Sequence, residues 1–183
     1  DGLRLRQLEF GVTYDDLYGV SVPAPGLAVA VGEGGTVLVQ HPETGAFQWV
    51  RSPVTDTLRG VCRFADGSIV AAGDGGVVLV GATPAVLSPW AVPQDGAPPT
   101  FLAVAGESEA DFWVGGTALF HVVAGAFHAV PLGPGSVVRA LALAPDGVVW
   151  AVTNDGVLWR GGHAGFRQVR SGSGADLFGV HGW

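Results

Sequence analysis

The chain has 183 residues, of which 48% are hydrophobic and only 14% are charged, and this composition is typical of a globular protein and not of a disordered one. Nine basic residues, all of them arginine, are outnumbered by 16 acidic residues, and the net charge of −7 disfavours general binding to nucleic acid or anionic membranes. The only cysteine, Cys62, excludes an intrachain disulfide and is interpreted as a small buried hydrophobe.

Five short apolar segments of one kind recur along the chain. They begin at Leu17, Leu58, Phe101, Val138 and Leu177, with spacings of 41, 43, 37 and 39 residues. The third residue of every segment is small: Gly19, Gly60, Ala103, Ala140 and Gly179. A small residue at this position is expected where innermost strands crowd around a common axis.

The first four segments are each followed by a glycine-centred hairpin and a further short strand. Valine-rich or aromatic runs around a glycine turn are typical of β-hairpins, and these hairpins cover residues 26–40, 67–81, 111–123 and 147–161. The further strands cover residues 46–52, 88–93, 126–132 and 165–171. Proline near the ends of some of these strands suits an outer edge strand. No helical period of 3.6 persists, which favours an all-β fold.

Two of these hairpins, VAVGEGGTVLV at 29–39 and VAAGDGGVVLV at 70–80, each place one acidic residue in a glycine cluster. A phosphate-binding P-loop requires a lysine, and the chain has none. A calcium loop requires several oxygen ligands, and each turn supplies one carboxylate. Glycine does supply the positive φ angles of tight turns, so we predict hairpin turns at Glu33, Asp74 and Asp155.

A period near 40 residues with four strands per unit is typical of β-propeller blades. We therefore predict one all-β propeller domain over residues 1–183, with about five blades. The complete blades are predicted at residues 15–55, 56–98, 99–135 and 136–175. Because residues 3–20 parallel residues 165–180, we expect terminal strands at 3–10 and 176–183. These strands either share a partial blade, or belong to a piece of a larger ring.

The strand pattern L-x-G-V, followed by V-G-x-G-G-x-V-L, resembles bacterial propellers of the BNR-like and photosystem II assembly-factor-like repeat superfamily. Residues 41–49 (HPETGAFQW) resemble a degenerate Asp-box, in which Glu43 replaces the aspartate and Trp49 lies one residue late. The resemblance implies a propeller fold. It also implies three classes of function, namely assembly factors that bind partner proteins, glycan-binding modules and sialidases.

Tyr18, Arg59 and Arg139 occupy the same position in their segments and are expected to line the mouth of the central channel. Bidentate pairing with a carboxylate requires arginine, so these residues could bind an anion. The sialidases implied by the resemblance clamp a carboxylate with three arginines, and the third is missing here. Alternatively, the two arginines lie in a solvated channel or pair with Asp16 or Asp56.

The remaining residues predict no catalytic residue, no metal site and no cofactor. The five histidines lack metal-binding spacing, and His121 and His128 are expected to form a surface pair across one hairpin. Trp49, Trp90 and Trp183 are candidates for aromatic contacts with a partner, although the recurrence of tryptophan also fits packing between blades.

These observations predict a non-catalytic scaffold that binds a partner protein across the channel mouth. The alternative is a carbohydrate-binding or sialidase-like propeller. No nucleic-acid or membrane partner is expected. Homo-oligomers are expected if the terminal strands pair between chains, because proteins rarely leave strand edges open.

Overall fold

The computed structural model describes residues 13–181. Over this range the secondary structure consists of sixteen β-strands and three single-turn 3-10 helices. None of these helices has the length and apolar character that crossing a membrane requires. The strands form four antiparallel sheets, and each sheet contains four strands that are consecutive in the sequence. The predicted all-β propeller fold with four complete blades is therefore confirmed.

Each sheet is one blade, and the blades are numbered in chain order. Blade 1 contains β1 (Leu17–Ser21), β2 (Val29–Gly32), β3 (Val37–Gln40) and β4 (Phe47–Val50). Blade 2 contains β5 (Leu58–Arg63), β6 (Ile69–Gly73), β7 (Val78–Thr83) and β8 (Val86–Pro89). Blade 3 contains β9 (Phe101–Ser108), β10 (Asp111–Gly116), β11 (Leu119–Val123) and β12 (Ala126–Ala129). Blade 4 contains β13 (Val138–Leu143), β14 (Val149–Thr153), β15 (Val157–Gly162) and β16 (Gly165–Arg170).

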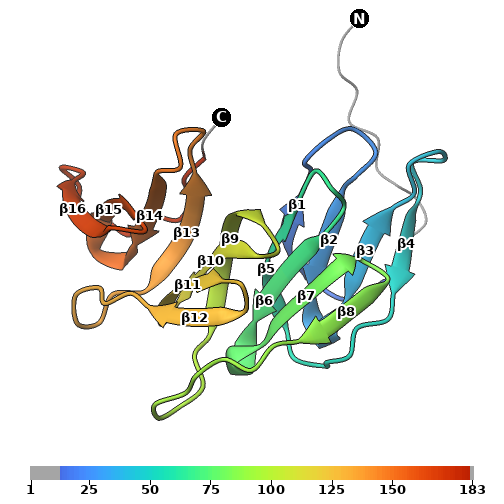
Figure 1. The fold of residues 1–183 in the computed structure, drawn as a ribbon, viewed down its shortest axis with the longest axis horizontal. Helices are drawn as coiled ribbons and strands as arrows, with labels where there is room; N and C mark the ends of the chain where they lie inside the picture. The colour runs from blue at the N-terminus through green and yellow to red at the C-terminus, as the bar shows by residue number, and fades with distance from the viewer. Residues whose placement is uncertain (1–12, 182–183) are drawn as a thin grey trace, which may run out of the picture.

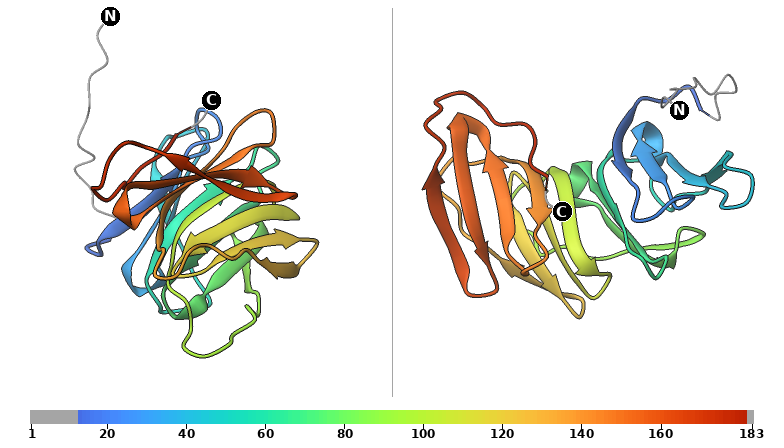
Figure 2. Two further views of the ribbon diagram at one scale, coloured as in Figure 1. Left: turned by 90° about the vertical axis from the view of Figure 1, so that its left-hand side faces the viewer. Right: turned by 90° about the horizontal axis from the view of Figure 1, so that it is seen from above.

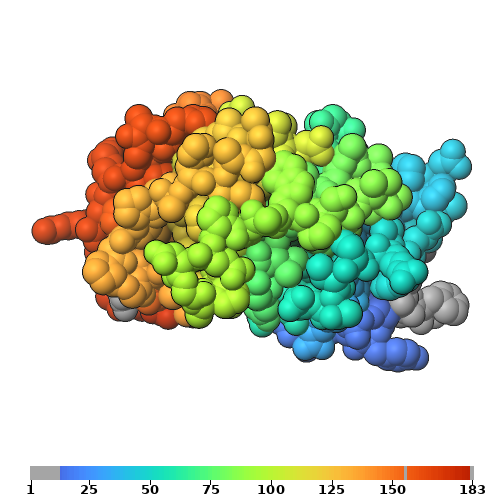
Figure 3. All heavy atoms as spheres, turned by 60° about the horizontal axis from the view of Figure 1, so that its bottom comes forward, coloured from blue at the N-terminus to red at the C-terminus, as the bar shows by residue number. Residues whose placement is uncertain are grey.

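The four blades follow one another along an arc. Blade 1 lies on the right of Figure 1 and blade 4 on the left, with blades 2 and 3 between them. The view from above in Figure 2 shows the curvature, with the C-terminal end on the concave side of the arc. The space-filling view in Figure 3 shows the same order of blades at the surface. Neighbouring blades meet through their first strands, β1 against β5, β5 against β9, and β9 against β13.

Hydrophobic clusters fill the spaces between neighbouring blades. Val70 and Val80 of blade 2 belong to one cluster with Phe112 of blade 3. The adjacent residues Ile69 and Leu79 belong to the cluster that blade 2 shares with blade 1, because successive side chains of a strand point to opposite faces. A central blade is therefore buried on both faces, which explains the continuous apolar runs in the sequence.

Small residues in the first strands have the steric role that the sequence predicts. A Cβ atom added at Gly60 would lie 3.0 Å from the Cα atom of Ala103 in the next blade. A Cβ atom added at Gly19 would lie 2.8 Å from the carbonyl oxygen of Arg59. In contrast, a Cβ atom at Gly179 would have no described atom within 4 Å. The close approach is thus a property of neighbouring complete blades.

The predicted hairpin turns are confirmed as three single-turn helices, η1 (Glu33–Gly35), η2 (Asp74–Gly76) and η3 (Asn154–Gly156). Gly34 and Gly75 have φ angles of 60° and 67°, in the left-handed region that favours glycine. Each acidic residue of η1 and η2 stands at the start of its turn, immediately beyond the end of the second strand.

The predicted terminal strand 3–10 lies outside the described residues, and residues 176–181 form no strand. The described part of the C-terminal segment does contact blade 4 and the cavity between the first strands. The N–H group of Leu177 donates a 3.4 Å hydrogen bond to the carbonyl oxygen of Thr153. Val180 lines the central cavity together with Val20 and Leu141, which hold the same position in their segments.

Candidate functional site

The residue after the first apolar position is equivalent in every segment. These residues therefore form a row that passes from one blade to the next, with one residue from each segment. The row consists of Tyr18, Arg59, Leu102, Arg139 and Phe178. We call the row and its acidic neighbours Asp16, Glu33, Asp74 and Asp176 the channel-mouth surface. The three candidates from the sequence, Tyr18, Arg59 and Arg139, all belong to it.

Arg59 forms an ion pair with Asp74 of its own blade. Its Nε donates to Oδ1 of Asp74 at 2.7 Å and its Nη2 donates to Oδ2 at 2.8 Å, which is a bidentate ion pair. The hydrogen bonds from Arg59 hold the pKa of the Asp74 carboxyl below its usual value, and those to Asp74 raise the pKa of Arg59. The partner of Arg59 is therefore Asp74 of the hairpin turn η2, and the predicted pairing with Asp16 or Asp56 was wrong. Because β6 pairs with β5, the turn that follows β6 brings Asp74 next to Arg59.

Tyr18 lies beside this ion pair. Its ring centroid is 5.1 Å from Cζ of Arg59, a cation–π contact, and its hydroxyl donates to Oε1 of Glu33 at 3.1 Å. The hydrogen bond to Glu33 raises the pKa of the Tyr18 hydroxyl. Tyr18 therefore remains a protonated donor at neutral pH, and 47% of its surface stays accessible.

Arg139 has a looser environment than Arg59. Its Cζ lies 5.8 Å from the ring centroid of Phe178, and its Nη2 lies 4.0 Å from Oδ2 of Asp176. The turn position that Asp74 holds in blade 2 is Asn154 in blade 4, and its amide is engaged by the backbone, with Oδ1 accepting at 2.7 Å and Nδ2 donating at 3.1 Å. Arg139 consequently has no bidentate carboxylate among the described residues.

The channel-mouth surface is therefore more acidic than the sequence suggested. Glu33 and Asp16 add negative charge near Tyr18. Asp74 and Asp176 lie beside the two arginines, and the pair with Asp74 already neutralises Arg59. An arginine clamp for a substrate carboxylate would first have to break that pair, so the geometry does not favour a sialidase-like site. Exposed aromatic rings beside carboxylates suit a segment that carries both a cationic and an apolar group.

The three candidate tryptophans have different surroundings. Trp49 lies on the outer strand β4 and is 54% exposed. Trp90 packs against the cluster between blades 2 and 3, with its ring centroid 6.0 Å from that of Phe112. Trp183 lies outside the described residues. Trp49 is thus the candidate of the three that the described surface exposes.

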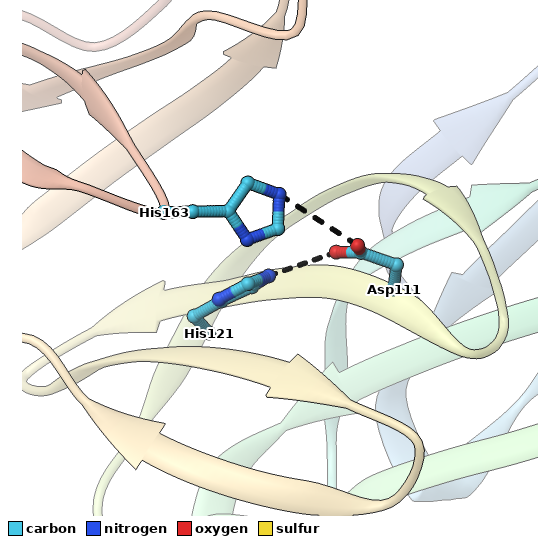
Figure 4. A group of neighbouring side chains, drawn as sticks. All are labelled: Asp111, His121 and His163. Carbon is cyan, nitrogen blue, oxygen red and sulfur yellow. Dashed lines mark hydrogen bonds and ion pairs between the residues drawn. The ribbon is translucent and has the colours of Figure 1, made fainter.

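A second group of polar residues lies between blades 3 and 4, as Figure 4 shows. Asp111 begins β10, His121 lies in β11, and His163 lies in the turn between β15 and β16. Nε2 of His121 is 2.8 Å from Oδ1 of Asp111, and Nε2 of His163 is 3.8 Å from Oδ2 of the same carboxylate. We call these residues the Asp–His–His cluster.

His121 is a buried member of this cluster. Only 6% of its surface is exposed, and its ring stacks on Trp113 with a centroid distance of 4.0 Å and an interplanar angle of 10°. It does align with His128 across the strands, but His121 is buried while His128 is exposed. The predicted surface pair of histidines was therefore wrong, because His121 points into the space between the blades.

The signal that sequence reasoning missed is a polar residue at an apolar position. In blades 1 and 2 the residues that correspond to His121 are Val39 and Val80, which pack in or against the clusters between blades. A histidine in their place requires a polar partner when buried. Asp111 supplies that partner within the same blade.

A central cavity of about 340 Å³ lies where the first strands meet, and Cys62 is among its lining residues. Burial raises the pKa of the Cys62 thiol to about 11. The thiol therefore remains protonated at neutral pH, and a thiolate nucleophile is not available there.

No protein-family model matches the chain, and no curated protein sequence does. The fold is nevertheless shared with known β-propeller-like structures. Selenomethionine-substituted virginiamycin B lyase from Staphylococcus aureus is 12% identical, with a TM-score of 0.78 over 90% of this chain. YCF48 bound to a D1 peptide is 12% identical, with a TM-score of 0.71 over 92% of this chain. The chain spans 59% of the length of each of these two proteins.

A third similar structure is a catalytically inactive histidine-to-alanine variant of the S. aureus lyase with quinupristin. It is 11% identical, with a TM-score of 0.65 over 87% of this chain and 71% of that chain. These likenesses establish a propeller-like fold, and the finer BNR-like assignment has no support from sequence families.

The expectation that the chain is not an enzyme is contradicted. It rested on the fold class and on missing motifs, but similar structures include an enzyme, virginiamycin B lyase. The propeller-like fold of this chain therefore gives no reason to exclude catalysis, although an identity of 11–12% transfers no activity to it.

Proposed function

We propose that the chain binds an extended segment of a partner protein at the channel-mouth surface. The observation that carries this proposal is the pair of exposed aromatic rings, Tyr18 and Phe178, which are 47% and 72% exposed and each contact an arginine. Exposed aromatic residues beside arginine are typical anchors of protein interfaces.

The charge of the surface indicates the chemistry of the segment. Glu33 lies beside the Tyr18 ring, and the chain carries a net charge of −7. A partner segment with lysine or arginine next to an apolar or aromatic residue would complement both this negative charge and the exposed rings. YCF48, one of the similar structures, binds a peptide, which supports a peptide ligand for this fold.

Selection of peptides from a random displayed library on the immobilised chain tests this proposal. Enriched peptides are expected to combine a basic and an apolar residue. In fluorescence anisotropy, Tyr18→Ala and Phe178→Ala are each expected to weaken the binding of an enriched peptide by about fivefold or more.

The matched control is Trp49→Ala, which removes an exposed ring of the outer strand β4. It is expected to leave peptide affinity unchanged. Peptides that bind Tyr18→Ala and Phe178→Ala as tightly as the original chain would overturn the proposal. A glycan array that gave binding sensitive to Trp49→Ala would instead favour the carbohydrate-binding alternative.

A further inference from the structure

The Asp–His–His cluster replaces an apolar contact between blades with three potential metal ligands. At the equivalent interblade positions, Val39 and Val80 pack apolar side chains. In blade 3 the same position is His121, and the residues facing it are Asp111 of its own blade and His163 of blade 4. Histidine in place of valine thus brings three potential metal ligands, Asp111, His121 and His163, together between blades 3 and 4.

The ligand atoms of these residues converge. One nitrogen of each histidine and one carboxylate oxygen of Asp111 all lie within 4.8 Å of one another. Metal–ligand bonds of about 2.0–2.1 Å in a tetrahedral site place neighbouring ligand atoms about 3.3–3.5 Å apart. Nε2 of His121 lies 2.8 Å from Oδ1 of Asp111, and Nε2 of His163 lies 3.8 Å from Oδ2 of the same carboxylate. The three side chains would therefore have to draw together around an ion, and the exposed side chain of His163 has the room to do so.

The two histidines differ in how firmly they are placed. His121 is fixed by its stacking on Trp113, and the ring of Phe166 lies edge-on to Trp113 at 5.3 Å between centroids. His163 is in a turn, and its side chain is 68% exposed. The exposed histidine can therefore adjust to an ion, while the buried histidine provides a preorganised ligand.

The ligand types favour particular cations. Two imidazoles and one carboxylate suit Zn²⁺ and the other divalent first-row transition metals, and they suit Mg²⁺ and Ca²⁺ poorly. A set of three protein ligands leaves a coordination position for water or another ligand. His163 also lines a surface hollow, so its side of the cluster is open to solvent.

We propose that Asp111, His121 and His163 form a site for a divalent transition-metal ion, with Zn²⁺ as the reference ligand. The site joins β10 and β11 of blade 3 to the outer hairpin of blade 4. Its residues are separate from those of the channel-mouth surface, so this inference does not depend on the proposed peptide binding.

Isothermal titration calorimetry of the tag-free chain with ZnCl₂, near neutral pH, tests the site. One ion per chain is expected. His163→Ala is expected to weaken binding by at least about tenfold, since loss of even a supporting residue of a metal site costs that much. Because the His163 side chain is 68% exposed, this variant is expected to keep the fold. CoCl₂ added instead should give visible absorption bands of a Co²⁺ ion with nitrogen ligands.

His121→Val restores the residue type of blades 1 and 2, so it is expected to fold while losing the metal. The matched control is His128→Ala, which removes an exposed histidine on the adjacent strand β12 and should leave Zn²⁺ affinity unchanged. Absence of saturable binding by the original chain, or a Zn²⁺ affinity in His121→Val and His163→Ala equal to that of the original chain, would overturn the proposal. Asp111 and His121 would then form a hydrogen-bonded pair of purely structural importance.

Discussion

Arg59 and Arg139 occupy equivalent positions in blades 2 and 4, but their surroundings differ. Arg59 forms two hydrogen bonds with Asp74, at 2.7 and 2.8 Å. Among the side chains that the structure describes, the carboxylate near Arg139 is that of Asp176 in the C-terminal segment, at 4.0 Å. The difference follows from one residue in the hairpin turn, because blade 4 carries the neutral Asn154 where blade 2 carries Asp74.

This comparison shows how a repeated scaffold acquires distinct sites. The two turns occupy the same place in their blades, since both are single-turn 3-10 helices after the second strand. A change from Asp to Asn preserves the turn but redirects the side chain to the backbone. The neighbouring arginine then contacts the next segment along the chain, through Phe178.

The largest expected effect on stability is that of replacing Gly60, which directly follows Arg59 in β5. Gly60→Val would force a side chain against the backbone of Ala103, at 3.0 Å from the first added atom. We expect the free energy of unfolding to fall by about 2–3 kcal/mol, measured by urea denaturation. Gly179→Val is the control, since its added atom meets nothing described within 4 Å. Equal losses in both variants would contradict the close approach of blades 2 and 3.

Exchange of the turn residues tests the comparison directly. Asp74→Asn gives blade 2 the turn residue of blade 4, and it is expected to lower the free energy of unfolding by about 1 kcal/mol. The expected loss is small because both side chains are 33% exposed and solvent screens the ion pair. Urea denaturation measures the change. Asn154→Asp should have a smaller effect, because a new ion pair with Arg139 is offset by loss of the amide's hydrogen bond to the backbone. A larger effect at Asn154 would reverse the comparison.

The pH dependence of stability sharpens the same contrast. The pKa of Asp74 is lowered by its hydrogen bonds from Arg59, so the folded chain binds fewer protons than the unfolded chain. Its stabilising contribution is present above the usual carboxyl pKa of 3.8 and is lost as the pH falls through the lower folded pKa. The stability difference between the original chain and Asp74→Asn should therefore stay constant from neutral pH to about pH 5 and shrink as the pH falls from there to below 3.8. A difference in urea midpoint that stayed constant over the acidic part of this range would show that the ion pair does not cause it.

The smallest expected effect is that of the Tyr18 hydroxyl. Tyr18→Phe keeps the ring over Arg59 and removes the hydrogen bond to Glu33. Because both groups are exposed, no measurable change in urea midpoint is expected. A clear loss of stability would indicate that the hydroxyl contributes more to the channel-mouth surface than its exposure suggests.

Local patterns in the sequence predict much of the fold. The spacing of the first strands, the small third residue at Gly19 and Gly60, and the glycine turns at Gly34 and Gly75 all concern residues near one another or equivalent in a repeat. These features follow from strand periodicity and backbone sterics, which a single sequence contains.

The sites were less predictable because they depend on contacts between elements. Asp74 was interpreted as a turn residue, and nothing in its local sequence indicates that its carboxylate reaches Arg59 on the neighbouring strand β5. His163 joins Asp111 only because blades 3 and 4 pack together. A buried polar residue at an apolar repeat position, such as His121, is the signal that could have revealed the second site.

The consecutive order of strands within each blade has a consequence for synthesis on the ribosome. Val29, Val31 and Val37 of blade 1 pack with Leu58 and Ile69 of blade 2, so their cluster is incomplete until blade 2 has emerged. With about 40 residues per blade and translation at about 5–20 residues per second, each new apolar face would wait some seconds for its cover. A nascent chain halted between blades would therefore expose an apolar sheet face, and chaperones that recognise such surfaces would be expected to bind it at that stage.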